Sequence, residues 1–272
     1  MFQACRQKAE ICLAVAFVTF KEWGAYRSHS MVSILVGPIF FLVQYFIWTA
    51  VYSAGDVGVM TLDETIRYFA ATALIGYLVM DFADWNLSML VRTGRFLTFA
   101  LRPMNHSFFA LSQKLGHRLL GFLVEFVPCW MIFMFILGID MRPAYLGWAI
   151  LSILLAFLMN FYVNYSIGLA SFWVVQSGGI RSVYALLGGV FSGMLIPLTF
   201  FPEWLQRVLL FLPFQYTSFV PAMVFLGKYS LGGITLEIPA VVGMQALAVG
   251  IAALLSGILN ELAMRRFTAV GA

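Results

Sequence analysis

The chain has 272 residues, of which 62% are hydrophobic and only 10% are charged, and its mean hydropathy is +0.93. A soluble domain has about 25% charged residues, so a soluble chain of this composition would expose large apolar patches. The composition therefore excludes a soluble protein. The apolar runs suit membrane helices, which need about 20 residues to cross, and the alternation of a membrane β-barrel is missing. We expect an all-α membrane protein.

The positive balance of the chain, 16 Lys and Arg against 12 Asp and Glu, is assigned to membrane topology. Cytoplasmic loops are enriched in Lys and Arg, which also contact anionic lipid headgroups. We therefore expect membrane lipids as partners and no nucleic acid. The three cysteines form no C-x-x-C pair and suggest no disulfide framework.

Residues 1–30 combine charged residues with an apolar run, 11–20, that is too short to cross a bilayer. We predict an amphipathic helix that lies along the cytoplasmic interface, with Phe20 and Trp23 at headgroup level. The alternative is an ordinary juxtamembrane tail.

Residues 31–272 are predicted to form one domain with six membrane-spanning helices. The helix of the second span is expected to continue through Asp81 and Asp84. Twelve of the sixteen basic residues then fall on cytoplasmic segments, which places both termini in the cytoplasm. The predicted spans are about 31–52, 66–80, 119–137, 145–173, 183–200 and 238–262.

The stretch 81–118, between the second and third spans, is the longest interior segment that a bilayer would not accept. Its charge places it in water on the cytoplasmic side. Its five basic residues are Arg92, Arg95, Arg102, Lys114 and Arg118.

The stretch 202–237 precedes the last span and contains two apolar pieces, each too short to cross, divided by Pro213 and Pro221. We predict two half-helices that dip into the outer leaflet and return. Irregular backbone at that depth is tolerated only where it packs against protein or lines a watery space.

Glu125 is the only carboxylate well inside an apolar run. Carboxylates within the membrane are functional candidates, so Glu125 could face the substrate route. The alternative is a structural pairing with Arg118 or His117.

Asn160, Asn164 and Ser171 lie on one face of the predicted fourth span, because residues four apart on a helix share a side. Such a polar stripe either bonds a neighbouring helix or lines a pathway. In the fifth span, Gly189 and Gly193 form a G-x-x-x-G pattern that predicts close helix packing.

The sequence contains no H-E-x-x-H metal motif and no G-x-x-x-x-G-K-[ST] nucleotide loop. We expect no metal, no cofactor and no enzymatic activity in this chain. If ATP supplies the energy for transport, a separate chain must hydrolyse it.

Six spans, an interfacial N-terminal helix, a basic loop after the second span and a re-entrant pair before the sixth resemble the permease subunit of an ABC-2 type ABC transporter. Within that superfamily, residues 92–103, RTGRFLTFALRP, are similar to the Gly, then Leu-x-Pro, signature of bacterial ABC-2 permeases once grouped as DUF990. The segment with Pro213, Phe214, Gln215 and Pro221 looks like the re-entrant segment of that family.

The resemblance implies an exporter in the bacterial cytoplasmic membrane, in which two permeases, identical or paralogous, pair with two ATPase subunits that bind ATP and Mg. Residues 84–118 would contain the helix that couples to the ATPase. Apolar side chains interleaved with arginines suit that role, although such a loop could instead lie on anionic lipid. The implied coupling residues are Arg92, Gly94, Arg95, Phe96, Leu101, Arg102 and Pro103.

The aromatic content of 17% favours an apolar or amphipathic substrate. One alternative is a secondary transporter, which needs inverted repeats or an ion site at mid-membrane. A membrane-embedded enzyme acting on lipid, or a purely structural subunit, are the others. Such an enzyme would need clustered His or carboxylate side chains near one interface.

Overall fold

The computed structural model describes residues 2–25, 27–55, 60–102, 104–174 and 178–266. Pro103, a predicted coupling residue, lies outside the described residues. The described chain is mostly helical, with one small antiparallel hairpin in which Ser230 pairs with Thr235. Its helices and strands are α1 (Phe2–Gly24), α2 (Arg27–Ala54), α3 (Leu62–Val79), α4 (Ala83–Arg92), α5 (Leu97–Ala100), α6 (His106–Gly121), α7 (Val127–Met131), α8 (Leu146–Leu169), α9 (Gly178–Phe191), α10 (Glu203–Leu209), α11 (Phe219–Leu226), β1 (Ser230–Leu231), β2 (Ile234–Thr235) and α12 (Ile238–Arg266).

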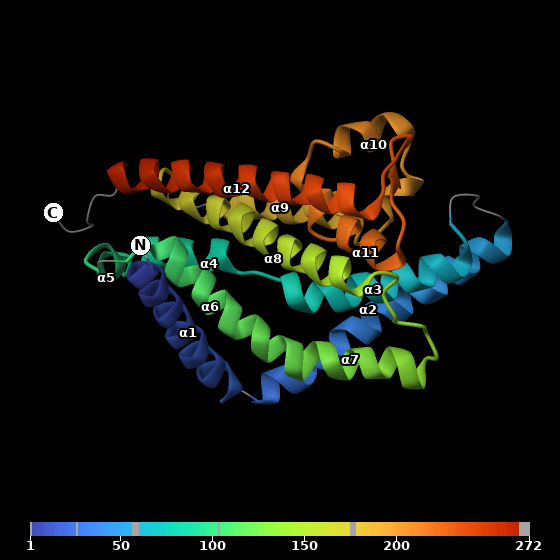
Figure 1. Ribbon diagram of the computed structural model, residues 1–272, viewed down its shortest axis with the longest axis horizontal. Coiled ribbons are helices and arrows are strands. Elements are labelled where there is room, and N and C mark those ends of the chain that lie inside the picture. The colour runs from blue at the N-terminus through green and yellow to red at the C-terminus, as the bar shows by residue number, and fades with distance from the viewer. Residues whose placement is uncertain (1, 26, 56–59, 103, 175–177, 267–272) are drawn as a thin grey trace.

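The long helices run side by side along one axis (Figure 1). The two marked termini and α5 lie at one end of this bundle, here called the α5 end, while α10 and the hairpin lie at the other, here called the hairpin end. Within the described residues, five helical segments are long and apolar enough to cross a membrane. They are Ser33–Ala54, Leu62–Arg92, His106–Ile136, Leu146–Phe172 and Ile238–Arg266.

The predicted fifth span is shorter than its sequence suggested. The helix α9 has 14 residues and ends at Phe191, not at residue 200. Gly193, which follows, has a left-handed φ of +85°, a conformation that commonly ends helices. A crossing needs about 20 residues, so α9 does not span the membrane by itself and the count of six crossings stays a prediction.

The predicted second helix does not continue through Asp81 and Asp84. The helix α3 ends at Val79, and α4 begins anew at Ala83. Asp81 favours this break, because its Oδ1 accepts hydrogen bonds from the backbone N–H groups of Phe82 (2.8 Å) and Ala83 (3.1 Å) at the start of α4. A short acidic side chain commonly satisfies free N–H groups at such a position.

The third membrane helix begins much earlier than predicted. Asn105 caps the start of α6, and the helix continues through two π-helical turns, Phe122–Phe126 and Ile132–Ile136. Lys114 and Arg118 therefore lie within a helix, where both are buried. The prediction that the whole stretch 81–118 lies in water is wrong for these two residues.

The helix α1 packs against α6, with Gly116 touching the backbone of Ala16. A Cβ at position 116 would overlap that backbone, so the close approach requires glycine. Trp23, near the end of α1, stacks on His117 with ring centroids 4.1 Å apart. The N-terminal helix is confirmed as a helix; its place at a membrane interface stays a prediction.

The stretch 202–237 contains two short helices, α10 and α11, as predicted. Helix α11 is buried against α3 and α8, and Pro221 lies inside it. Gln215 is fully buried and bonded: its Nε2 donates to the carbonyl of Leu210, and its Oε1 accepts from the Tyr229 hydroxyl. The irregular backbone thus packs against protein, whereas its depth in a membrane stays a prediction.

The predicted G-x-x-x-G packing face does not form as one helical surface. Gly189 lies in α9, but Gly193 lies beyond the end of that helix. The carbonyl of Gly193 accepts a hydrogen bond from the buried hydroxyl of Tyr68 at 2.7 Å. Glycine is needed at position 193 because the backbone is left-handed there and because a Cβ would contact Tyr68 and Phe219.

Candidate coupling site at the α5 end

The turn between α4 and α5 is built on Gly94. This residue has a φ of +71°, a left-handed conformation that costs other residues about 1–2 kcal/mol. The N–H of Gly94 donates to the carbonyl of Val91, and the N–H of Phe96 donates to the carbonyl of Leu90. The glycine thus allows α4 to end and the chain to turn back into α5.

Phe96 anchors this turn in the protein. Its side chain is only 1% exposed and packs in a cluster with Leu87, Tyr165 and Leu169. Its ring also lies 5.1 Å from that of Phe172. Phe96 was predicted to contact an ATPase, but its burial means that it positions the turn instead.

The remaining coupling candidates form an exposed corner of the α5 end. Arg92, Gly94 and Arg95 are exposed, and Leu101 is 79% exposed. Arg102 is exposed as well, and its guanidinium lies 4.7 Å above the ring of Phe99. The segment 92–102 therefore presents three exposed cations and an exposed leucine, on a backbone anchored by Phe96.

Behind this corner, polar side chains from α6 and α8 cap the open end of α3. The last carbonyls of a helix lack partners within the helix, and cations are favoured there. Arg118 Nη1 donates to the carbonyl of Tyr77 at 2.6 Å. The carbonyl of Val79 accepts from the Asn160 amide and from Lys114 Nζ at 3.4 Å.

Lys114 also forms an ion pair with Asp81, with Nζ and Oδ2 3.2 Å apart and both side chains buried. The buried set Asp81, Lys114, Arg118 and Asn160 is here called the polar node. It joins the end of α3, the link to α4, and the helices α6 and α8. Next to it, Asp84 in the first turn of α4 pairs with Arg181 of α9, Oδ2 to Nε 2.8 Å.

The predicted pathway residues are engaged within the protein. Glu125 accepts a hydrogen bond from the Ser33 hydroxyl and interacts electrostatically with Arg118. A Cβ on Gly121 would lie 3.1 Å from Glu125 Oε2 and 3.9 Å from Arg118 Nη1, so these two groups meet around that glycine. This geometry supports the structural alternative for Glu125.

The polar stripe on α8 divides between two roles. Asn160 bonds the neighbouring helix α3 through the Val79 carbonyl, while Asn164 Nδ2 donates to Asn160 itself, to the backbone oxygen at 2.8 Å. Ser171 donates to the carbonyl of Gly168 in its own helix. Asn164 and Ser171 are buried. Of the three, only Asn160 therefore bonds a neighbouring helix, and a pathway role for the other two stays a prediction.

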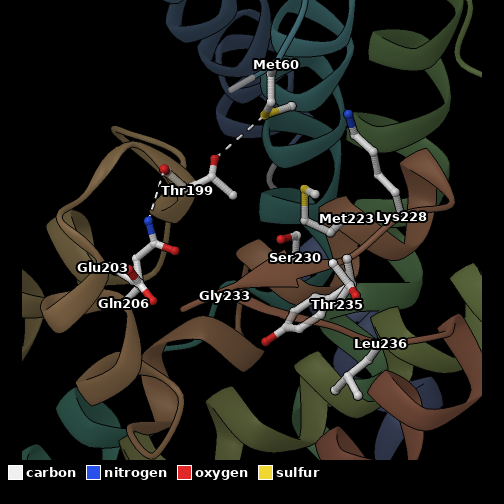
Figure 2. Close-up of a pocket in the computed structure, with 11 residues that line it drawn as sticks. Met60, Thr199, Glu203, Gln206, Met223, Lys228, Ser230, Gly233, Thr235 and Leu236 are labelled. Carbon is white, nitrogen blue, oxygen red and sulfur yellow. Dashed lines mark hydrogen bonds between the residues drawn. The ribbon is translucent and has the colours of Figure 1, made fainter. Parts of the chain in front are cut away.

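A hollow of about 560 Å³ lies at the hairpin end. Figure 2 shows Glu203 and Gln206 on one side of it and Met223 and Lys228 on the other. Gln206 Nε2 donates to two backbone carbonyls, and Lys228 pairs with Glu64 at 2.6 Å. Burial raises the pKa of the Tyr229 phenol, which also lines the hollow. These polar groups stabilise the surrounding segment rather than form a reactive site.

Sequence reasoning missed the polar node because each member has an ordinary surface or membrane interpretation by itself. The sequence predicts that Asp81 and Asp84 lie in a helix that leaves the membrane. It also predicts that Lys114 lies in a loop in water. A signal was present in the spacing of Lys114 and Arg118. These cations are four residues apart, which places them on one helix face, in line with an apolar run that continues beyond them.

The apolar spans agree with the family comparison. A family model described as ABC-2 family transporter protein matches residues 35–271, which is most of the chain. This chain belongs to the ABC-2 transporter family. The permease resemblance inferred from residues 92–103 and from the architecture is confirmed at that level.

No curated protein and no solved structure shows significant similarity to this permease. Family membership makes the chain a multi-pass membrane component of ABC transport, a class that is not itself catalytic and that associates with ABC ATPases. Among the residues that the structure describes, no three His, Cys, Asp or Glu gather as metal ligands.

Proposed function

We propose that this permease is the membrane-spanning subunit of an ATP-driven exporter in the bacterial cytoplasmic membrane. Two permeases, identical or paralogous, would form the pathway for an apolar or amphipathic substrate. Two separate ATPase subunits would bind ATP and Mg. Both termini and the α5 end would then face the cytoplasm, and the hairpin end would face outward.

The observation that carries this proposal is the exposed corner formed by Arg92, Arg95, Leu101 and Arg102. An exposed leucine in a segment with three exposed cations suits a partner that offers an apolar groove with acidic edges. Because Phe96 fixes the corner to the core of the α5 end, a push from such a partner would reach the spanning helices.

The proposed mechanism is alternating access. Closure of the ATPase dimer on ATP displaces the two corners, and this movement rocks the two helical bundles against each other. A route between them then opens toward the outer side. The buried ion pairs of Asp81 and Asp84 give no observation in favour of a lipid-modifying enzyme, because both carboxylates are engaged by cations.

Co-purification from the native membrane tests the proposal. We expect an ATPase to purify with the unaltered permease, and Leu101→Glu to reduce its recovery at least tenfold, because a carboxylate is costly to bury in an apolar groove and is repelled by the acidic edges of that groove. Ile234→Glu, at an exposed apolar position of the hairpin end, is the matched control and should retain the ATPase. Equal recovery with both variants would remove the corner from the interface.

A further inference from the structure

The Lys114 ammonium bonds three segments of the chain at one point. It pairs with Asp81 of the α3–α4 link at 3.2 Å and donates to the Val79 carbonyl at the end of α3 at 3.4 Å. It also donates to the Phe157 carbonyl of α8 at 3.0 Å, and it lies 4.4 Å above the Phe157 ring. The Lys114 ammonium thus holds α3 and α8 by hydrogen bonds and the α3–α4 link by an ion pair.

Stability alone does not explain a buried lysine at this position. Removing a charge from water is costly, and apolar side chains of similar volume often replace buried ion pairs without loss of stability. A methionine on α6 would fill a similar volume without that cost. The apolar side chain lacks the hydrogen bonds to α3 and α8 and the ion pair with Asp81. The lysine is therefore explained by the relative positions in which it holds these segments.

Asp81 connects this point to the coupling corner. Its Oδ1 accepts the N–H groups of Phe82 and Ala83, which open α4, while its Oδ2 faces Lys114. Helix α4 leads directly to the Gly94 turn. A displacement of the corner along α4 therefore acts on Asp81, and through Lys114 on α6 and α8.

The second connection of α4, from Asp84 to Arg181, is of a different kind. The Arg181 side chain is 41% exposed and belongs to the short helix α9, whereas both side chains of the Lys114 pair are at most 6% exposed. An exposed arginine can exchange its partner for water, so this pair constrains movement less. The polar node is the stiffer route to the long helices.

We propose that Lys114 is a positioning residue that passes movement of α4 to α6 and α8, so that its loss separates ATP hydrolysis from rearrangement of the hairpin end. This inference rests on the proposed exporter function. It assigns a part in coupling to a residue that has no contact with substrate, nucleotide or ATPase.

The test uses the permease and its ATPase reconstituted in lipid nanodiscs, with the native cysteines replaced by alanine and Ser230→Cys as a reporter at the hairpin end. Maleimide labelling of the reporter is timed without nucleotide and after trapping with ATP and vanadate. In the parent chain we expect trapping to change the labelling rate at least threefold. With Lys114→Met, ATP hydrolysis should persist while the nucleotide effect on labelling falls below 1.5-fold.

Three further variants separate positioning from folding. Lys114→Arg keeps a donor cation and should restore at least half of the nucleotide effect. Asp81→Asn keeps the volume and leaves α6 unchanged, and it should lose the effect as Lys114→Met does. Lys8→Met removes an exposed cation from α1 and should behave as the parent chain.

The outcomes distinguish the inference from the proposed function. A nucleotide effect that survives unchanged in both Lys114→Met and Asp81→Asn overturns the positioning role and leaves the exporter function standing. A parent chain that recruits no ATPase, or whose labelling never responds to nucleotide, instead overturns the exporter function. A loss of the effect that Lys114→Arg does not restore, with equal melting temperatures, also contradicts the inference.

Discussion

Single residues in this permease act through backbone geometry as much as through charge. Gly94 sits in open space, with no atom within 4 Å of where a Cβ would lie, yet its φ of +71° is needed for the coupling turn. Lys114 and Arg118 show a different case. Their charged side chains are buried because they donate hydrogen bonds to the carbonyls at the end of α3. The identity of a residue therefore predicts its environment only when its partners are known.

Gly94→Ala should weaken the coupling corner without any steric clash. We expect a strain of about 1–2 kcal/mol in the turn, which partly melts it and lowers ATPase activity in the assembled complex several-fold. Gly147→Ala in α8 is the matched control, because its added methyl also meets no neighbouring atom but its backbone is helical. ATPase assays on both variants decide the point, and equal activity would show that the turn needs no left-handed residue.

The family resemblance drew attention to Gly94 and to the arginines of the corner, but residue patterns predicted neither the turn at Gly94 nor the polar node. The Asp81–Lys114 pair joins residues that are 33 positions apart, and nothing local to either one indicates the other. Phe96 was assigned to the surface for a similar reason. In the sequence, an aromatic residue among arginines suggests an exposed contact for a partner protein. Only the structure shows that Phe96 packs with Leu87 and Tyr165.

At the scale of elements, the chain was predicted well where apolar runs were long and poorly where helices broke. The spans around α2, α8 and α12 follow from length and hydropathy alone. The break at Asp81 and the end of α9 depend on one capping carboxylate and one left-handed glycine. Such positions are weak signals in a sequence, because both residue types also occur inside helices and loops.

The end of α9 gives a prediction for Gly193. A Cβ there would approach the Tyr68 hydroxyl to 2.5 Å, and the backbone would also be strained. We expect Gly193→Ala to lower the free energy of unfolding by about 2–4 kcal/mol, from overpacking together with the left-handed strain. A thermal melt in detergent measures this, with Gly189→Ala as the control because its nearest neighbour would be 3.9 Å away.

Tyr68→Phe combined with Gly193→Ala isolates the steric part of that cost. Removing the hydroxyl makes room for the methyl. The fall in melting temperature caused by Gly193→Ala should therefore be smaller in the Tyr68→Phe background than in the parent chain. An additive loss would instead show that backbone strain or the contact with Phe219, and not the contact with Tyr68, causes the cost.

At the scale of the whole molecule, charge and architecture agree. The α5 end carries the basic corner and, in the last turn of α12, Arg265 and Arg266. The hairpin end carries ion pairs in which Glu203 and Glu64 neutralise their cations. An excess of Lys and Arg marks the cytoplasmic side of membrane proteins, so the α5 end is expected inside.

Labelling from the two sides of a sealed membrane tests this orientation. We expect Thr98→Cys, an exposed position on α5, to react with an impermeant maleimide only in inverted vesicles, and Ser230→Cys on β1 to react only in right-side-out vesicles. Both positions are exposed, so a missing reaction reflects the side of the membrane rather than burial. If both reacted from the same side, the chain would cross the membrane an even number of times between residues 98 and 230, whereas this arrangement requires an odd number. The coupling corner and the hairpin would then share a compartment, and the rocking mechanism would have to be abandoned.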